Sequence, residues 1–139
     1  MKLLIIGGTR NWARGVHLWN LALDENNGPH LGGCGDCRGV VTINRRTGEV
    51  TRNVEYYVLA HASRFVRPGA VRIESDTGVE GLESVAFRNA HDGSIALIVL
   101  NGADEARRFA VAFEDRAFDA ERPPGAVATF VWPPNQSSD

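Results

Sequence analysis

Two cysteines are the first candidates for chemistry in this chain. Cys34 and Cys37 are its only cysteines, and they lie in the run GGCGDCRG with Asp36 between them. A lone CxxC pair supplies two of the four ligands that a structural zinc ion needs, so we predict no metal and no other cofactor. The glycines favour a loop rather than the strand-to-helix setting of a thioredoxin-like site. The state of the pair stays open between a loop-pinning disulfide, two free thiols, and metal or redox chemistry.

The acidic residues do not indicate a catalytic pair. Asp24 and Glu25 lie in a predicted turn, and Glu49 and Glu55 flank a predicted hairpin and helix. We interpret these carboxylates, and those of the second half of the chain, as solvated surface acids. Asp36 is better explained as a turn-stabilising residue than as a catalytic one. The sequence therefore predicts no catalytic residue in this chain.

The elements that hold the cysteine loop are predicted from the first half of the chain. A short strand over residues 18–23 is apolar on both faces, apart from Asn20, which is typical of a strand buried in a parallel sheet. The run DENNGP after it predicts a turn. Residues 39–51 read as a hairpin, and residues 54–65 have the apolar spacing of a helix that Pro68 ends.

The pattern of apolar residues and turns changes near residue 68. Runs rich in Val, Ile, Phe and Ala, separated by turns with Gly, Asn or Asp, predict an antiparallel sandwich. The predicted strands are 70–75, 82–89, 94–101, 107–113 and 126–132. The aromatic residues of this half lie mostly within the strand patterns and are predicted to be core. Residues 133–139 are polar and predict a flexible tail.

Bulk composition excludes several classes of protein. The apolar fraction of 43% and the charged fraction of 23% are close to those of globular domains, so disorder is not indicated. A net charge of −2 gives no reason to expect nucleic acid as a partner. The apolar run Leu3–Ile6 is too short for a signal-peptide core or a membrane span, and localisation is left undetermined.

Four ordered motifs carry a family resemblance. WNLALDENNGPHLGGCGDCRGVVTIN, EYYVLAHASRFVRPGAVRI, VAFRNAHDGSIALIVLN and GAVATFVW resemble the C-terminal region of glycoside hydrolase family 30 over residues 9–132. That family includes glucosylceramidases and endo-β-1,6-glucanases. The resemblance implies a mixed α/β chain: residues 1–67 as the C-terminal remnant of a (β/α)8 barrel, residues 68–132 as an antiparallel β-sandwich, and residues 133–139 as a tail.

The resemblance also implies a function. Family members are retaining β-glycosidases that use two glutamates, and both would precede Met1 here. We therefore expect a C-terminal fragment that is inactive alone, needs the missing barrel portion as partner, and meets a β-glucoside or glucan only in the complete enzyme. The family is often secreted.

The resemblance further suggests substrate-binding residues. Trp19 matches a family tryptophan that lines a glucose subsite, and an indole suits the apolar face of a sugar ring. Cys34 aligns with a pocket-lining asparagine of a glucosylceramidase in the family, and His30 is placed to hydrogen-bond a hydroxyl group. The family's GGP motif is changed here to Asn27-Gly28-Pro29.

Two other functions stay open. As an alternative, the chain is a non-catalytic carbohydrate-binding or assembly module whose function lies in the β-sandwich. The opening LLIIGG could also be a strand that runs into a dinucleotide-binding turn, although Ala13 stands where a third glycine would be needed. The alternative to a strand in this segment is a short helix with Thr9 as its N-cap.

Overall fold

The computed structural model describes residues 1–134 of the chain. It contains two compact units. One, the sandwich unit, consists of Met1–Arg14 and the chain from His61 onward, and the other, the loop unit, is Gly15–Ala60. The predicted tail lies outside the described residues apart from positions 133 and 134. The predicted division at residue 67 stays a prediction.

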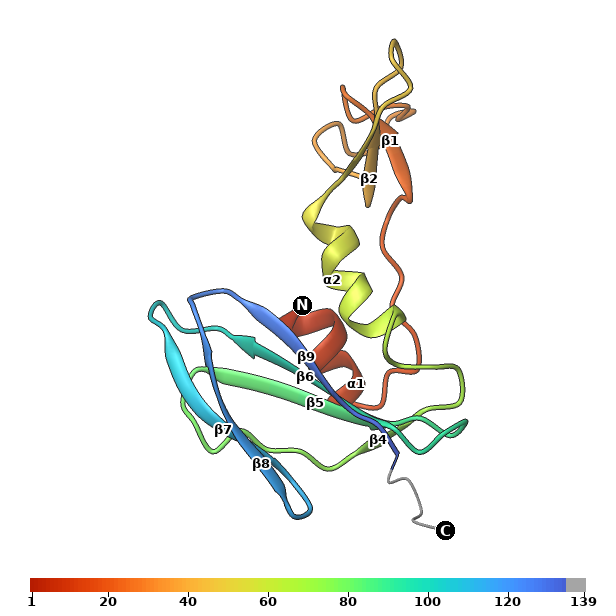
Figure 1. The fold of residues 1–139 in the computed structure, drawn as a ribbon. Helices are drawn as coiled ribbons and strands as arrows, with labels where there is room; N and C mark the ends of the chain where they lie inside the picture. Colours follow the sequence, from red (N-terminus) through yellow and green to blue (C-terminus); the bar gives the residue numbers. More distant parts are fainter. Residues whose placement is uncertain (135–139) are drawn as a thin grey trace. The chain divides into compact units, whose positions relative to one another are not determined.

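The sandwich unit is built on a four-stranded antiparallel sheet with the order β4-β5-β6-β9 (Figure 1). Its strands are β4 (Val71–Ile73), β5 (Leu82–Arg88), β6 (Ile95–Asn101) and β9 (Val127–Trp132). A second sheet is the hairpin of β7 (Arg107–Phe113) and β8 (Arg116–Arg122). The prediction of a β-rich second half is confirmed. The sequence did not reveal β8, because its side chains are mostly exposed and it lacks an apolar alternation.

The two sheets enclose the main core. Ile95 and Val99 of β6 lie on the same face as Trp132 of β9, and this face packs against Phe109 and Val111 of β7. Successive side chains of a strand point to opposite faces, so the other residues of β6 need separate cover. Ala96 and Ile98 are nevertheless fully buried, which means that a second layer covers the outer face of the sheet.

The N-terminal segment supplies that layer. Lys2–Gly7 forms a π-helix, η1, that continues into α1 (Gly8–Arg10) and contacts β5, with Ile5 and Ile6 buried. Lys2 forms an ion pair with Glu83. The prediction of an N-terminal strand, which a dinucleotide-binding turn would require, is therefore wrong. Tertiary packing of the isoleucines on the sheet overrides their β-propensity.

The alternative prediction for the N-terminus was also wrong. Thr9 lies inside the helical segment rather than at its N-cap, and its hydroxyl donates to the carbonyl oxygen of Ile5 at 2.6 Å. The helix ends at Arg10, and Trp12, just beyond it, has a φ of 69°. The guanidinium of Arg72 lies 4.7 Å from the centre of the exposed Trp12 ring. Side-chain bonding to the preceding turn is the usual alternative to capping for a threonine.

A histidine also lies on the outer face of the sheet. His61 Nδ1 is 2.9 Å from the hydroxyl oxygen of Thr129 on β9. Thr129 is the register partner of Ile98, so this contact is on the same face as the N-terminal helix. Desolvation of the imidazole lowers the pKa of His61 below its usual value of 6.5.

This burial predicts a pH-dependent stability. The folded chain binds the proton of His61 less tightly than the unfolded chain, so the stabilisation is present above about pH 6.5 and is lost as the pH falls. We expect His61→Gln to flatten the dependence of the urea midpoint on pH between about 7 and 5. His17→Gln, at an exposed position, is the control and should keep the profile. An unchanged profile in the His61 variant would contradict the assignment.

The loop unit contains a three-stranded sheet. β1 (Ala22–Asp24) pairs in parallel with β2 (Val41–Ile43), and β2 pairs antiparallel with β3 (Val50–Arg52). The helix α2 (Val54–Ser63) follows and continues across the boundary between the units. The predicted hairpin and helix are confirmed.

The predicted strand over residues 18–23 is only partly correct. The strand begins at Ala22, and Leu23 is its buried residue. Trp19 and Leu21 have exposed fractions of 73% and 76%, so the prediction of burial on both faces was wrong.

Over the described residues the fold is mostly β, which agrees with a β-sandwich domain. None of the described helices has the length and apolar character needed to cross a membrane.

Candidate functional site

The loop between β1 and β2 begins at a turn closed by Asp24. Its Oδ1 accepts hydrogen bonds from the backbone N–H groups of Asn26 at 2.9 Å and Gly28 at 2.7 Å. The backbone of Asp24 also donates to the Gly28 carbonyl oxygen at 2.8 Å. The N–H of Gly28 is the main cause that lowers the pKa of Asp24. This carboxylate therefore holds the turn as an ion and is not available as a proton donor near neutral pH.

The other end of the loop is held by a close approach of two backbones. Val40 and Val41 donate to the carbonyl oxygens of Asn20 and Leu21 at 3.0 and 2.9 Å, which extends the parallel pairing beyond β1. A Cβ atom on Gly39 would lie 2.9 Å from the backbone nitrogen of Leu23. Glycine is therefore required at this position for steric reasons.

Two polar side chains connect this end of the loop to the start of α2. Arg38 Nη2 donates to Glu55 Oε1 at 2.9 Å, and this hydrogen bond is the main cause that lowers the pKa of Glu55. Asn53 Nδ2 donates to the carbonyl oxygen of Gly39 at 2.8 Å. Neither Arg38 nor Asn53 was predicted from the sequence to have this role. The one available signal was an acid, Glu55, in the first turn of a predicted helix next to a loop with an arginine.

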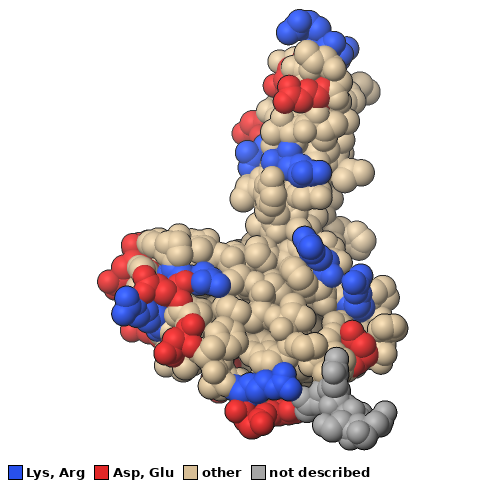
Figure 2. Space-filling model, viewed as in Figure 1, with Lys and Arg blue, Asp and Glu red and all other residues tan. Residues whose placement is uncertain are grey.

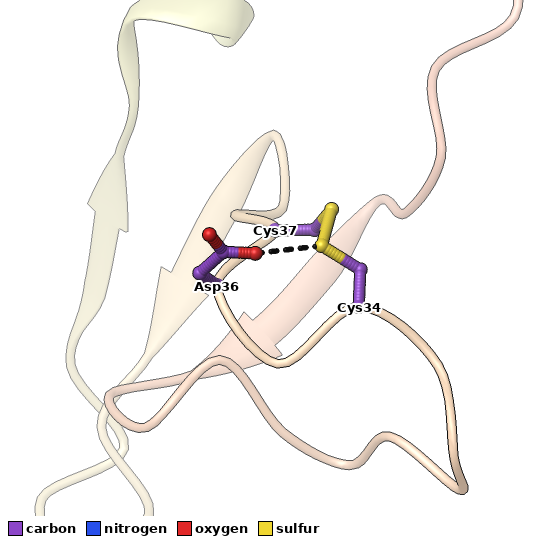
Figure 3. A group of neighbouring side chains, drawn as sticks. All are labelled: Cys34, Asp36 and Cys37. Carbon is purple, nitrogen blue, oxygen red and sulfur yellow. Dashed lines mark hydrogen bonds between the residues drawn. A yellow bond between two sulfur atoms is a disulfide. The ribbon is translucent and has the colours of Figure 1, made fainter.

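The cysteines are joined in the middle of the loop. Cys34 and Cys37 form a disulfide, which resolves the three alternatives in favour of a loop-pinning bond in this state of the chain. Asp36 Oδ1 lies 2.9 Å from Cys34 Sγ (Figure 3). A disulfide sulfur carries no proton, so this approach is a close contact and not a donated hydrogen bond. The two sulfur-bearing residues are half-buried and Asp36 is exposed.

The three predicted binding residues have different surroundings. Trp19 lies in a bend before β1, rather than at the end of a strand, and its indole is largely exposed. His30 is exposed, and its ring lies against the backbone of Gly35, where an added Cβ would be 3.7 Å from Nε2. The structure therefore brings His30 next to the residue that follows Cys34. Trp19 makes no hydrogen bond to another described side chain.

The sandwich unit has an opening of its own between the two sheets. It has a volume of about 290 Å³ and is lined by apolar side chains such as Leu97, Phe109 and Trp132 and by polar residues of the segment that follows β4. Of the aromatics predicted to be core, Phe118 is the exception, with an exposed fraction of 42%. The opening therefore combines apolar side chains of both sheets with the polar residues 74–77 and Ser84.

Charge does not single out another surface. Figure 2 shows basic and acidic side chains of both units interspersed on the face in view, without a continuous region of one sign. Arg45, for example, lies 3.6 Å from Asp24, and its backbone N–H donates to Glu25 at 2.9 Å. Mixed charge of this kind is typical of a solvated surface.

Comparison with known families gives a match in the sandwich unit. Residues 69–130 match the glycosyl hydrolase family 30 beta sandwich domain. This range covers the strands from β4 to most of β9. The match agrees with the two-sheet arrangement described above.

Individual relatives extend the similarity to the loop unit. The chain is 42% identical over 105 residues to an endo-1,6-beta-D-glucanase of Neurospora crassa, covering 69% of this chain and 22% of that protein. It is 32% identical over 132 residues to a putative glucosylceramidase 4 of Caenorhabditis elegans, covering 88% and 24%. The solved structure of the endo-beta1,6-glucanase BT3312 matches with a TM-score of 0.85 and 35% identity, covering 95% of this chain and 30% of that one. The chain thus spans less than a third of the length of each of these relatives.

Proposed function

Because the chain belongs to glycoside hydrolase family 30, we propose that it forms the C-terminal part of a retaining β-glycosidase that cleaves β-1,6-linked glucan. The observation that carries the proposal is the similarity to the glucanase BT3312, which covers 95% of this chain at 35% identity. The identity to the Neurospora crassa glucanase, 42%, is also higher than the 32% to the putative glucosylceramidase.

In this proposal the chain does not supply the catalytic carboxyl groups. A retaining glycosidase needs a general acid that is still protonated near neutral pH, and therefore a carboxyl group with a raised pKa. Instead, a hydrogen bond from the Gly28 N–H lowers the pKa of Asp24, and one from Arg38 lowers the pKa of Glu55. Hydrogen bonds from Ser94 likewise lower the pKa of Asp92. The two glutamates would come from another part of the enzyme.

The chain would contribute the β-sandwich and one wall of the sugar site. Residues 1–67 would be the end of a (β/α)8 barrel, supported by a parallel strand pair, β1 and β2, followed by α2. The rest of the barrel would be its partner. Trp19, His30 and Cys34 would line the wall, because an exposed indole precedes a loop that is fixed at both ends. A largely exposed indole can stack on a pyranose.

A chimera tests the proposal. The chain is exchanged for the matching C-terminal region of the glucanase BT3312, and hydrolysis of a β-1,6-linked gluco-oligosaccharide is measured. We expect the chimera to be active and the isolated chain to show no turnover. Turnover by the isolated chain that Asp24→Asn or Glu55→Gln abolishes would overturn the assignment of catalysis to another part.

Trp19 gives the sharpest prediction in this chimera. Trp19→Ala should lower kcat/KM by about 10- to 100-fold through lost stacking on the sugar, and Trp19→Phe should lose less. Trp12→Ala is the matched control, because Trp12 has an exposed fraction of 78% but lies in the sandwich unit. Equal losses for the two alanine variants would contradict a sugar contact at Trp19.

A further inference from the structure

The cysteine loop carries a second chemical possibility that neither the family match nor the proposed function contains. We propose that, once its disulfide is reduced, the segment His30–Cys37 binds one zinc-like divalent cation. Cys34 and Cys37 would provide two thiolates, Asp36 a carboxylate oxygen and His30 an imidazole nitrogen. No metal was predicted from the cysteine pair alone. The structure adds the carboxylate of Asp36 to that pair and places His30 next to Gly35, outside the close group of three ligand atoms.

Three of the ligand atoms are already close together. The sulfurs of Cys34 and Cys37 and a carboxylate oxygen of Asp36 all lie within 4.8 Å of one another. Around a tetrahedral zinc with bonds of about 2.0–2.3 Å, ligand atoms are separated by about 3.3–3.8 Å. Once the bond between the sulfurs is broken, they must move apart to this separation, while the carboxylate oxygen stays beside them. Figure 3 shows the carboxylate turned toward the sulfur of Cys34.

The fourth ligand comes from the start of the same loop. The ring of His30 lies over Gly35, the residue between Cys34 and Asp36, and an added Cβ there would be 3.5 Å from its Cε1 and 3.7 Å from its Nε2. Among the described residues none forms a hydrogen bond with this ring, so both nitrogens are available. A His, Asp and two Cys set is a combination of nitrogen, oxygen and sulfur ligands that zinc accepts.

The backbone of the loop can adjust without disturbing its supports. Gly32 and Gly33 have no atom within 4 Å of an added Cβ, and Gly32 has a φ of 68°. The anchors lie outside the proposed ligand segment, at the Asp24 turn and at the Arg38–Glu55 pair. A rearrangement of residues 30–37 around an ion would therefore leave β1, β2 and the start of α2 in place.

The disulfide and the metal site exclude each other. A two-electron reductant, a dithiol or a phosphine with water, converts the disulfide to two thiols and is itself oxidised to a disulfide or a phosphine oxide. The cation then replaces the two thiol protons, which are released to solvent. The oxidised loop has no thiolates and does not bind the cation.

Cobalt is a direct probe of this site. The full chain, without an affinity tag, is reduced with a phosphine, desalted without oxygen and titrated with Co²⁺. We expect one equivalent to bind, with thiolate charge-transfer absorption in the near ultraviolet and the visible bands of tetrahedral cobalt. Zn²⁺ should abolish these bands, and the oxidised chain should not develop them. Absence of the charge-transfer absorption in the reduced chain would overturn the proposal.

Substitutions test the contribution of each proposed ligand separately. Cys34→Ser should remove about half of the charge-transfer intensity, whereas His30→Gln and Asp36→Asn should keep it but raise the Kd for Co²⁺ by about tenfold or more. His17→Gln, an exposed histidine outside the loop, is the matched control and should not change the Kd. Equal effects of the two histidine variants, or one ion bound by two chains, would overturn the site. These readouts do not depend on glycosidase activity, so they can fail or succeed independently of the proposed function.

Discussion

Asn101→Asp is expected to lower the free energy of unfolding of the chain by about 3–5 kcal/mol. Asn101 is fully buried at the end of β6, and its amide nitrogen lies 2.8–3.1 Å from the carbonyl oxygens of Glu105, Arg122 and Pro123. Its side-chain oxygen accepts a hydrogen bond from the N–H of Ala103 at 3.0 Å. An aspartate has the same shape, but it would place a carboxylate against carbonyl oxygens without donating a hydrogen bond.

The position of Asn101 explains the size of this effect. The side chain connects the segment that leaves β6 with the segment that leads from β8 into β9. It therefore joins the two sheets at one edge of the sandwich, and the backbone of Asn101 adds hydrogen bonds with Gly125 and Ala126, both at 2.9 Å. A buried network of this kind leaves several groups unsatisfied when one member is lost.

Urea unfolding followed by circular dichroism measures this prediction. Asn11→Asp is the matched control, because the exposed Asn11 side chain donates a single hydrogen bond, to the Gly7 carbonyl oxygen at 2.8 Å. We expect the control to change the free energy by less than about 1 kcal/mol. Similar losses for the two variants would show that the network around Asn101 does not hold the sheets together.

Gly39→Ala is expected to destabilise the loop unit by about 2–3 kcal/mol. The added methyl group would lie 2.9 Å from both the backbone nitrogen of Leu23 and the carbonyl oxygen of Val41. These atoms belong to the paired strands β1 and β2, so neither can move without weakening the parallel pairing. The cost is steric and is not explained by a special backbone angle.

Hydrogen exchange provides the local readout for Gly39. The amides of Val40 and Val41 donate across the strand pair, so the alanine variant should expose them to faster exchange, while the amides of β6 should keep their protection. Gly33→Ala is the control, because an added Cβ at that position has no atom within 4 Å. If Gly33→Ala accelerated exchange at Val40 as strongly, the close approach at Gly39 would not be the cause.

Local sequence patterns were sufficient for several elements. The hairpin that contains β2 and β3, the helix α2 and the long strands β5 and β6 have strong periodicity or turn signals of their own. The family was also recognisable, because the motifs that carry it are ordered and cover most of the chain. Where the signal was weak, as in the polar strand β8, prediction failed.

The sequence by itself determined the β-rich second half, the hairpin and helix before it, and the loop with two cysteines as the region of interest. Only the tertiary structure decided that LLIIGG is helical, because its two isoleucines are buried against a sheet formed by residues far along the chain. It also decided how the loop is held, since Arg38 is hydrogen-bonded to Glu55, which lies 17 positions further along the chain. Finally, it placed His30 beside Gly35, a proximity that depends on how the loop folds back on itself and has no signature in residue spacing.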